Sequence, residues 1–350
     1  MFLLTLLAFV VILGLLIFVH ELGHFLSAKA AGVKVEEFAF GFPPHIICVK
    51  KGETKYCVNA IPFGGYVKML GEDKAADSPR SFSHKKPSRR FAISVAGVVM
   101  NFILAGVLFS IGYMIGMSPI RLDPAALGGT ASNEVIVVQV FENSSAEKAG
   151  VVPGDVIVGF NSAEELSQYT KENVGKPVDF EIKRSGKVIP LQVQLSEDKT
   201  SPFGVGIGTA SRVKLPFIKA VYFGFKDMIF TTGYILTLLW NIIIGLFRER
   251  RVVGGVAGPV GIFNITGEAV KMGIIYLIQL AGLLSINLGL VNILPFPALD
   301  GSRAILILAE GIARRKVIRE EIEAVLHTVG FAILILLISA ITIKEIIGLF

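Results

Sequence analysis

The sequence predicts a polytopic α-helical membrane protein with about four spans, a membrane-associated β-hairpin or loop sheet, and an inserted soluble α+β domain. The chain of 350 residues is 53% hydrophobic, and its mean hydropathy is +0.66. Only 18% of its residues are charged, whereas soluble domains carry about 25%. Long apolar segments surround one polar stretch, residues 121–210, which contains short strand-like patterns.

The N-terminal membrane region, residues 1–120, contains two predicted spans. Residues 2–27 form the first, and we expect a retained helix because the apolar run exceeds the roughly 7–15 residues of a signal peptide. Residues 91–117 form the second, whose small residues permit close helix packing. Between the spans, residues 35–70 alternate around the turn "KKGET", which predicts a β-hairpin that dips toward the membrane.

The rest of the chain divides into three predicted regions. Residues 121–210 form the soluble domain, which we expect outside the cytosol. Residues 211–275 form a linker region at the membrane surface. Residues 276–350 form the C-terminal membrane region, with spans at about 276–309 and 322–347.

Basic residues cluster between the first two spans. They are Lys50, Lys51, Lys55, Lys68, Lys74, Lys85, Lys86, Arg89 and Arg90. The positive-inside rule places this loop in the cytosol, so the net charge of +6 does not indicate a nucleic-acid partner. Both cysteines, Cys48 and Cys57, lie in the same loop without CxxC spacing, and we expect them to be reduced thiols.

The first span ends in the sequence "HELGH", residues 20–24. On a helix, His20 and His24 share one face and can bind a single metal ion. Two neutral imidazoles with an oxygen ligand and one open position suit Zn²⁺, whose bound water has a pKa of about 7. Glu21 is placed to take the proton from that water. The alternative is a pair of hydrogen-bonded histidines at a helix end.

A third ligand is needed, and Asp300 is the preferred candidate. It lies in an apolar segment, where an unpaired acid costs several kcal/mol. Ala30 occupies the position at which a metzincin would supply a third histidine. Glu36 and Glu37 are further candidates, but they follow closely in a predicted strand.

The depth of Asp300 also bears on the topology. His24 and Asp300 lie at similar distances from the starts of their spans, so they meet only if both helices run in the same direction. Residues 217–247 are apolar but interrupted by charges, and a crossing there would reverse that direction. We therefore expect this segment to lie on the membrane or to re-enter it, although the basic residues at 248–251 argue against this.

Asn292, Pro295 and Pro297 precede Asp300. Proline lacks an N–H group and frees helical carbonyls, which is tolerated in a membrane where the chain lines a cavity. Asn292 could then bind a substrate backbone or stabilise an oxyanion. The alternative for the prolines is a simple helix kink.

The stretch "SSAEKAGVVPGDVIVGFN" resembles a PDZ domain. PDZ domains bind extended peptides or C-termini by strand addition, which makes such a peptide a possible partner. A spacer or steric gate that binds nothing is an equally good interpretation.

Taken together, the motifs resemble the site-2 protease family of intramembrane zinc metalloproteases, in the bacterial regulator-of-sigma-E-protease-like branch with one PDZ domain. The resemblance rests on "HELGH", "IPFGGYVKM" (61–69), "AGVVMNF" (96–102), the PDZ-like segment, "GPVGI" (258–262) and "NILPFPALDG" (292–301). The sequence departs from the family pattern at "GFP" (41–43) and at Val98.

The resemblance implies a Zn²⁺ enzyme of the bacterial inner membrane that hydrolyses peptide bonds in or near transmembrane segments. Anti-sigma factors and signal-peptide remnants are typical substrates, and the metal site faces the cytosolic side. His20, His24 and Asp300 would bind zinc, and Glu21 would act as general base. Asn292, Pro295, Pro297, Gly64, Gly65 and Tyr66 would contact the substrate, the last three from a re-entrant β-loop.

Two other functions fit the same residues. A metal transporter or sensor could use the ligands without hydrolysis, but it would not need Glu21 as a base. A PDZ-bearing membrane scaffold would depend on residues 121–210 rather than on the metal site.

Overall fold

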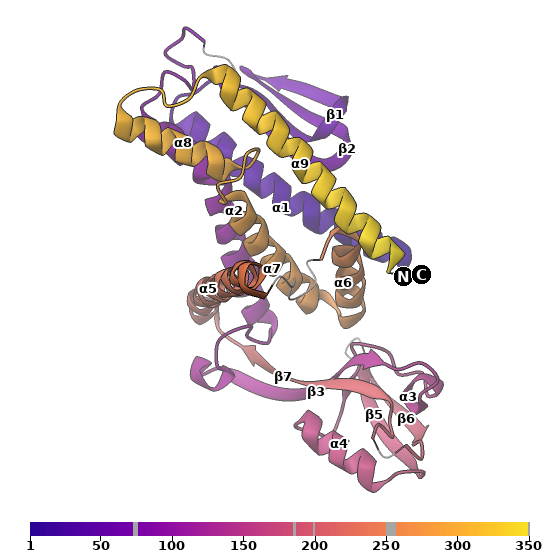
Figure 1. Cartoon of the computed structure of the whole chain (residues 1–350). Coiled ribbons are helices and arrows are strands. Elements are labelled where there is room, and N and C mark those ends of the chain that lie inside the picture. Colours follow the sequence, from indigo (N-terminus) through magenta and orange to yellow (C-terminus); the bar gives the residue numbers. More distant parts are fainter. Residues whose placement is uncertain (73–75, 185–186, 199, 250–256, 349–350) are drawn as a thin grey trace. The chain divides into compact units, whose positions relative to one another are not determined.

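The computed structural model describes residues 1–72, 76–184, 187–198, 200–249 and 257–348 (Figure 1). The chain forms two compact units. The first comprises residues 1–106, 232–264 and 281–350, and the second comprises residues 107–231 and 265–280.

Four described helices are long and apolar enough to cross a membrane, which agrees with the predicted number of spans. They are α1 (Phe2–Ala30), α2 (Pro87–Ile115), α7 (Ile274–Asn292) and α9 (Glu320–Ile347). Helix α5 (Phe217–Glu249) is not one of the four, and its location at the membrane surface stays a prediction.

Residues 276–309, expected as one apolar span broken at its two prolines, form two separate helices. Helix α7 ends at Asn292, a non-helical loop follows, and α8 (Asp300–Ala313) begins at Asp300. The two prolines of the loop cannot donate backbone hydrogen bonds, and Ala298 has a φ of +80°.

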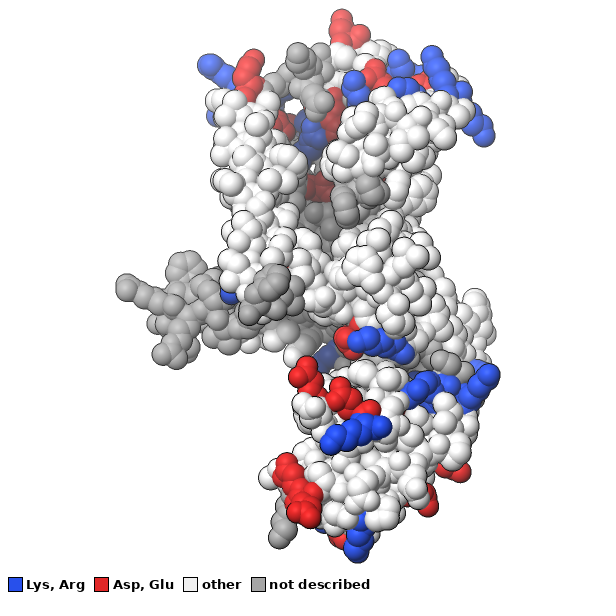
Figure 2. Space-filling view, turned by 90° about the vertical axis from the view of Figure 1, so that its right-hand side faces the viewer, with Lys and Arg blue, Asp and Glu red and all other residues white. Residues whose placement is uncertain are grey.

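In Figure 2, the first unit carries charged side chains at the end that bears the α8–α9 loop, and most of the remaining face is uncharged.

The predicted hairpin is present as β1 (Val35–Lys51) and β2 (Thr54–Met69), which pair antiparallel. Both strands are long and bent, so the sheet folds back on itself. Residues 37–40 pair with 65–68 on one side and with 55–58 on the other. The sheet therefore places four short segments side by side, in the order 65–68, 37–40, 55–58 and 47–50.

The hairpin turn is tied to α1 by ion pairs. Glu53 Oε1 lies 2.8 Å from Lys29 Nζ and 2.6 Å from Arg80 Nη2. Hydrogen bonds from Arg80 and Lys29 lower the pKa of Glu53 to about 2. The turn consequently stays anchored over the pH range in which this carboxylate is ionised.

The expectation of two reduced cysteines is also wrong. Cys48 and Cys57 stand directly opposite each other across β1 and β2 and form a disulfide, with their Cα atoms 4.2 Å apart. Directly opposed residues in an antiparallel pair bring their Cβ atoms within reach of a disulfide. The irregular pairing of the preceding residues sets this register, and it is not visible in the spacing of the two cysteines.

The second unit contains a five-stranded sheet with the order β6-β5-β4-β3-β7. Its strands are β3 (Thr130–Val140), β4 (Val156–Ile157), β5 (Pro177–Arg184), β6 (Lys187–Gln194) and β7 (Val205–Lys214). A short 3₁₀ helix, η1 (Pro124–Leu127), precedes the sheet, and α3 (Ser145–Lys148) and α4 (Ala163–Glu172) accompany it. The core includes Val135, Val137, Ile157, Leu166, Phe180 and Ile182.

Helix α9 caps the start of α6 (Pro259–Met272). The Glu345 carboxylate accepts hydrogen bonds from the N–H groups of Gly258, at 2.7 Å, and of Val260, at 3.2 Å. The first N–H groups of a helix have no partner within it, so this carboxylate satisfies donors that would otherwise be unpaired.

A buried carboxylate, Asp227 of α5, organises the second unit. It accepts hydrogen bonds from the Tyr113 hydroxyl at 2.7 Å and from the N–H groups of Ile120 and Arg121 at 3.0 Å. Asp227 is 0% exposed. Three donors therefore share one acid, which joins the end of α2 and the segment after it to α5.

The substitution Asp227→Asn should destabilise the fold. The Asp227 carboxylate accepts with both of its oxygens, whereas asparagine offers one acceptor oxygen and one N–H₂ group. At least one of the three donors would therefore face the N–H₂ group and lose its hydrogen bond. We expect a loss of about 1–3 kcal/mol, measured by chemical unfolding of the purified protein in detergent. Asp179→Asn, at an exposed position of β5, is the control. Equal stability of the two variants would contradict the anchoring role.

Candidate metal centre and catalytic site

Three ligand atoms meet between α1 and the start of α8. His20 and His24 are both buried, and their Nε2 atoms lie 3.3 Å apart. Asp300 Oδ2 lies 2.9 Å from Nε2 of His20 and 3.3 Å from Nε2 of His24. The structure thus brings together the two histidines and the acid that the sequence singles out as metal ligands.

The arrangement fits a zinc ion. The Nδ1 nitrogen of His24 faces the Ile93 carbonyl at 2.8 Å, so in the neutral ring Nδ1 carries the hydrogen and Nε2 carries a lone pair. Asp300 Oδ2 is buried and has no hydrogen-bond partner among the described residues. Lone pairs that face one another at such distances suit a bound cation, and two imidazoles with one carboxylate are a donor set of catalytic zinc sites.

Asn101 of α2 holds the other histidine. Its side-chain amide lies 3.1 Å from His20 Nδ1, and the residue is 0% exposed. As placed, the amide nitrogen faces the ring, and Asn101 Oδ1 has no partner among the described residues. Turning the amide by 180° lets Oδ1 accept the Nδ1 hydrogen, which leaves the His20 Nε2 lone pair for a metal ion.

Glycine allows α1 and α2 to approach closely at this site. A Cβ atom on Gly97 would lie 2.3 Å from His24 Nε2 and 2.8 Å from His20 Nε2. A Cβ on Gly23 would lie 2.4 Å from the Ala96 carbonyl oxygen. Any larger residue at these two positions would displace the histidines or separate the helices.

The hairpin covers Glu21. A Cβ on Gly65 would lie 2.9 Å from Glu21 Cγ, which shows how closely β2 approaches α1. Glu21, Gly65 and Tyr66 line one cavity of about 190 Å³ together with the three ligand residues. Gly64 does not line it but takes a φ of +106° beside the Phe42 ring.

A hydrogen bond to Glu37 positions Tyr66. The Tyr66 hydroxyl donates to Glu37 Oε1 at 2.6 Å, and burial together with this bond raises the pKa of Tyr66. Asp300 is the acid that meets the two histidines, whereas Glu37 contacts Tyr66. Glu36 pairs with Lys68 at 3.9 Å. The structure favours Asp300 over both glutamates as the third ligand.

The residues before Asp300 separate into two groups. Asn292 Nδ2 lies 3.4 Å from His20 Nε2, so this amide is close to the centre. Pro295 and Pro297 line a different pocket, beside α9. They shape the loop, which α9 holds: the Ala298 N–H donates to His327 Nδ1 at 3.1 Å, and Gly330 packs against Pro297.

An ion pair that sequence reasoning missed lines the cavity. Arg303 of α8 pairs with Glu72, which follows β2. Arg303 lies one helical turn after Asp300. A basic residue near the end of an apolar segment is common, so the sequence did not single out Arg303 as part of the site. The pair ties the start of α8 to the hairpin. In Figure 2, acidic and basic side chains lie inside a hollow of the first unit.

An HExxH helix, a converging acid and apolar candidate spans define a membrane metallohydrolase. Residues 8–337 match the family described as Peptidase family M50. A zinc metalloprotease of Clostridium perfringens is 37% identical over 337 residues, covering 95% of each chain. The regulator of sigma-W protease RasP of Bacillus subtilis is 31% identical and is matched over 100% of both chains. The chain belongs to peptidase family M50, the site-2 protease family, and is a zinc metalloprotease.

The proposed orientation of Asn101 can be tested by two substitutions of similar size. Asn101→Asp keeps an acceptor for the His20 Nδ1 hydrogen and should retain zinc, whereas Asn101→Leu should weaken zinc binding by about 10–100-fold. Competition with a chelator measures the affinity without relying on activity. Equal zinc affinity of Asn101→Leu and the unmodified protein would show that His20 does not depend on this acceptor.

Proposed function

We propose that this protein is an intramembrane protease that cleaves peptide bonds in or near transmembrane segments of other membrane proteins. The observation that carries the proposal is the convergence of His20, His24 and Asp300 beside Glu21 on an apolar helix. In this proposal, His20, His24 and Asp300 bind the zinc ion.

Glu21 is the general base. It lines the same cavity as the ligands and sits under the hairpin, where it can take a proton from the attacking water and pass it to the leaving amine. Zinc bound at this centre supplies Lewis acidity and lowers the pKa of water to about 7. The Asn292 amide, close to His20, donates a hydrogen bond to the developing oxyanion.

The hairpin presents the substrate. A transmembrane helix hides its carbonyls in hydrogen bonds and must be unwound locally before attack. In the described pairing, residues 65–68 pair with 37–40 on one side only, so their other edge can accept an added strand. This edge includes Gly65 and Tyr66, which line the cavity, and Gly64 supplies the turn beside them.

The membrane orientation follows from the charges. The basic loop around the hairpin lies on the cytosolic side, which places the metal centre toward the cytosol and the five-stranded domain outside it. The inner membrane of a bacterium is the proposed location. A relative named as a regulator of sigma-W protease supports membrane-bound anti-sigma factors as substrates, with signal-peptide remnants as a second class.

The five-stranded domain is proposed to act as a PDZ domain that binds a peptide or C-terminus. Strand β7 is at the edge of its sheet, and a cavity of about 710 Å³ lies between β7 and α4. Leu166 of α4 and Phe203, Val205 and Ile207 around β7 give this groove an apolar lining. An extended peptide would add to β7 and place side chains in the groove.

The substitution Glu21→Gln tests the protease against a transporter or sensor. We expect cleavage of a single-span membrane substrate to fall by about 10²–10⁴-fold, because the general base is lost, while zinc content stays unchanged. Glu181→Gln, at an exposed position of β5, is the control and should cleave normally. Undiminished cleavage by a zinc-loaded Glu21→Gln protein would refute the assignment.

The substitution Ser167→Trp tests the peptide groove. Ser167 lines the groove on α4, and a tryptophan there should block it. We expect a labelled peptide with a free C-terminus to bind about tenfold more weakly or worse, corresponding to about 1.4 kcal/mol, by fluorescence anisotropy. Gln192→Trp, exposed on β6, is the control. If the unmodified protein binds no peptide at all, the domain is a spacer or size filter.

A further inference from the structure

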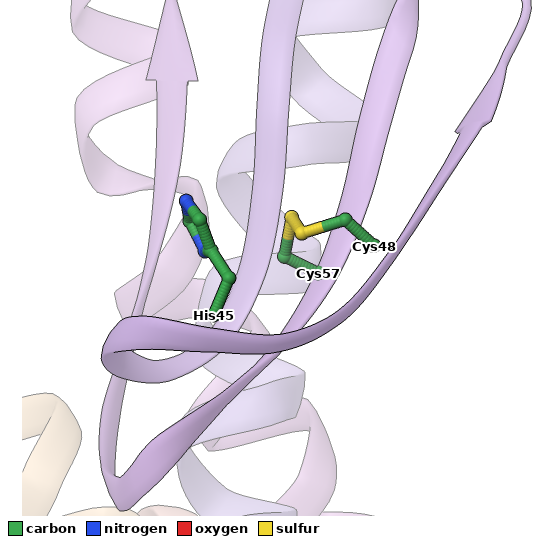
Figure 3. A group of neighbouring side chains, drawn as sticks. All are labelled: His45, Cys48 and Cys57. Carbon is green, nitrogen blue, oxygen red and sulfur yellow. A yellow bond between two sulfur atoms is a disulfide. The ribbon is translucent and has the colours of Figure 1, made fainter.

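A second group of metal-ligand side chains lies in the hairpin, apart from the catalytic centre. His45, Cys48 and Cys57 each offer one ligand atom, and these atoms lie within 4.8 Å of one another. Figure 3 shows the His45 ring next to the Cys48–Cys57 disulfide, on the two paired strands. None of the three residues has a part in the proposed proteolytic mechanism.

The hairpin orients His45 as metal-binding histidines are oriented. Its Nδ1 lies 2.8 Å from the side-chain oxygen of Asn59, which is only 3% exposed. The Asn59 amide nitrogen donates to the Gly41 carbonyl at 2.9 Å, so the oxygen is the atom that faces the ring. In neutral His45, Nδ1 therefore carries the hydrogen and Nε2 carries a lone pair; Glu37 Oε1 lies 3.8 Å from this Nε2.

The sulfur atoms become ligands on reduction. A cellular dithiol that reaches the half-buried Cys48 sulfur can break the S–S bond, transferring two electrons and two protons. The reductant leaves as a disulfide, and Cys48 and Cys57 become thiols. A divalent ion then displaces the two thiol protons and binds two thiolates.

We propose that in this dithiol form His45, Cys48 and Cys57 bind one thiophilic divalent cation such as Zn²⁺, and that the disulfide and the metal complex are mutually exclusive states. Two thiolates and one imidazole are a donor set that zinc prefers, with water as the fourth ligand. The predicted cytosolic side of this loop is a reducing compartment, in which the dithiol state is accessible.

Cobalt distinguishes this site from the catalytic one. The catalytic ligands are two imidazoles and a carboxylate, so only the hairpin can give a thiolate-to-cobalt charge-transfer band. Full-length protein in detergent is treated either with a phosphine reductant or with a thiol oxidant, and then loaded with Co²⁺ or Zn²⁺ without oxygen. Thiol titration confirms the redox state, and elemental analysis counts the metal.

We expect the reduced protein to bind one more zinc ion than the oxidised protein and to show the cobalt band. The double variant Cys48→Ser/Cys57→Ser should lack both. His45→Ala keeps both cysteines and should weaken the second ion by about 10–100-fold or more, since even a residue that only orients a ligand has this effect. His84→Ala, at an exposed histidine elsewhere in the first unit, should bind normally.

The proposal would be overturned if the reduced protein, loaded with Zn²⁺ or Co²⁺, had free thiols but bound no additional metal ion and showed no charge-transfer band. The cysteines would then form a structural disulfide only. Equal metal binding by His45→Ala and the unmodified protein would also overturn the three-residue site. Because the readouts are metal count and absorption, these results do not depend on whether the protein cleaves transmembrane substrates.

Discussion

The meeting of one carboxylate with two imidazoles constrains much of the first unit. Burying the Asp300 carboxylate among apolar helices is costly unless a cation compensates it. Helix α7 must therefore end early and α8 must begin where its first residue faces α1. The non-helical loop between α7 and α8 makes this turn possible, and its backbone is tolerated because neighbouring protein groups satisfy it.

The same constraint explains the glycines of α1 and α2. The two histidines need room beside their Nε2 atoms, and Gly97 provides it by having no side chain. In membranes, helices associate through such close packing because lipid gives no hydrophobic driving force between them. The features that bring α2 near α1 also bring Asn101 to the back of His20, so packing and ligand orientation depend on one helix crossing.

The sequence alone could predict features that depend on one-dimensional signals. The spacing of His20 and His24 predicts a metal-binding helix face, and an acid in an apolar segment makes Asp300 a candidate third ligand. Hydropathy indicates about four spans, and alternation around a turn indicates the hairpin. These signals do not depend on how the elements pack, and the three side chains that they single out lie together in the structure.

Other features depend on packing and register, which the sequence does not display. The contact of Asn101 with His20 depends on the rotation of α2 against α1. The pairing of Cys48 with Cys57 depends on irregularities in two bent strands, where a shift of one residue would turn the side chains to opposite faces. The prolines predicted an interruption, but not that a new helix would start at Asp300.

The attachment of the α7–α8 loop to α9 has a consequence for biosynthesis. The histidines belong to the first helix to leave the ribosome, whereas the loop before Asp300 is held by His327 and Gly330 of a much later one. Because chains fold from the N-terminus during synthesis, we expect the contacts that hold this loop to form only after α9 has docked. A partly synthesised chain therefore already contains His20 and His24 but lacks the helix that holds the loop before Asp300.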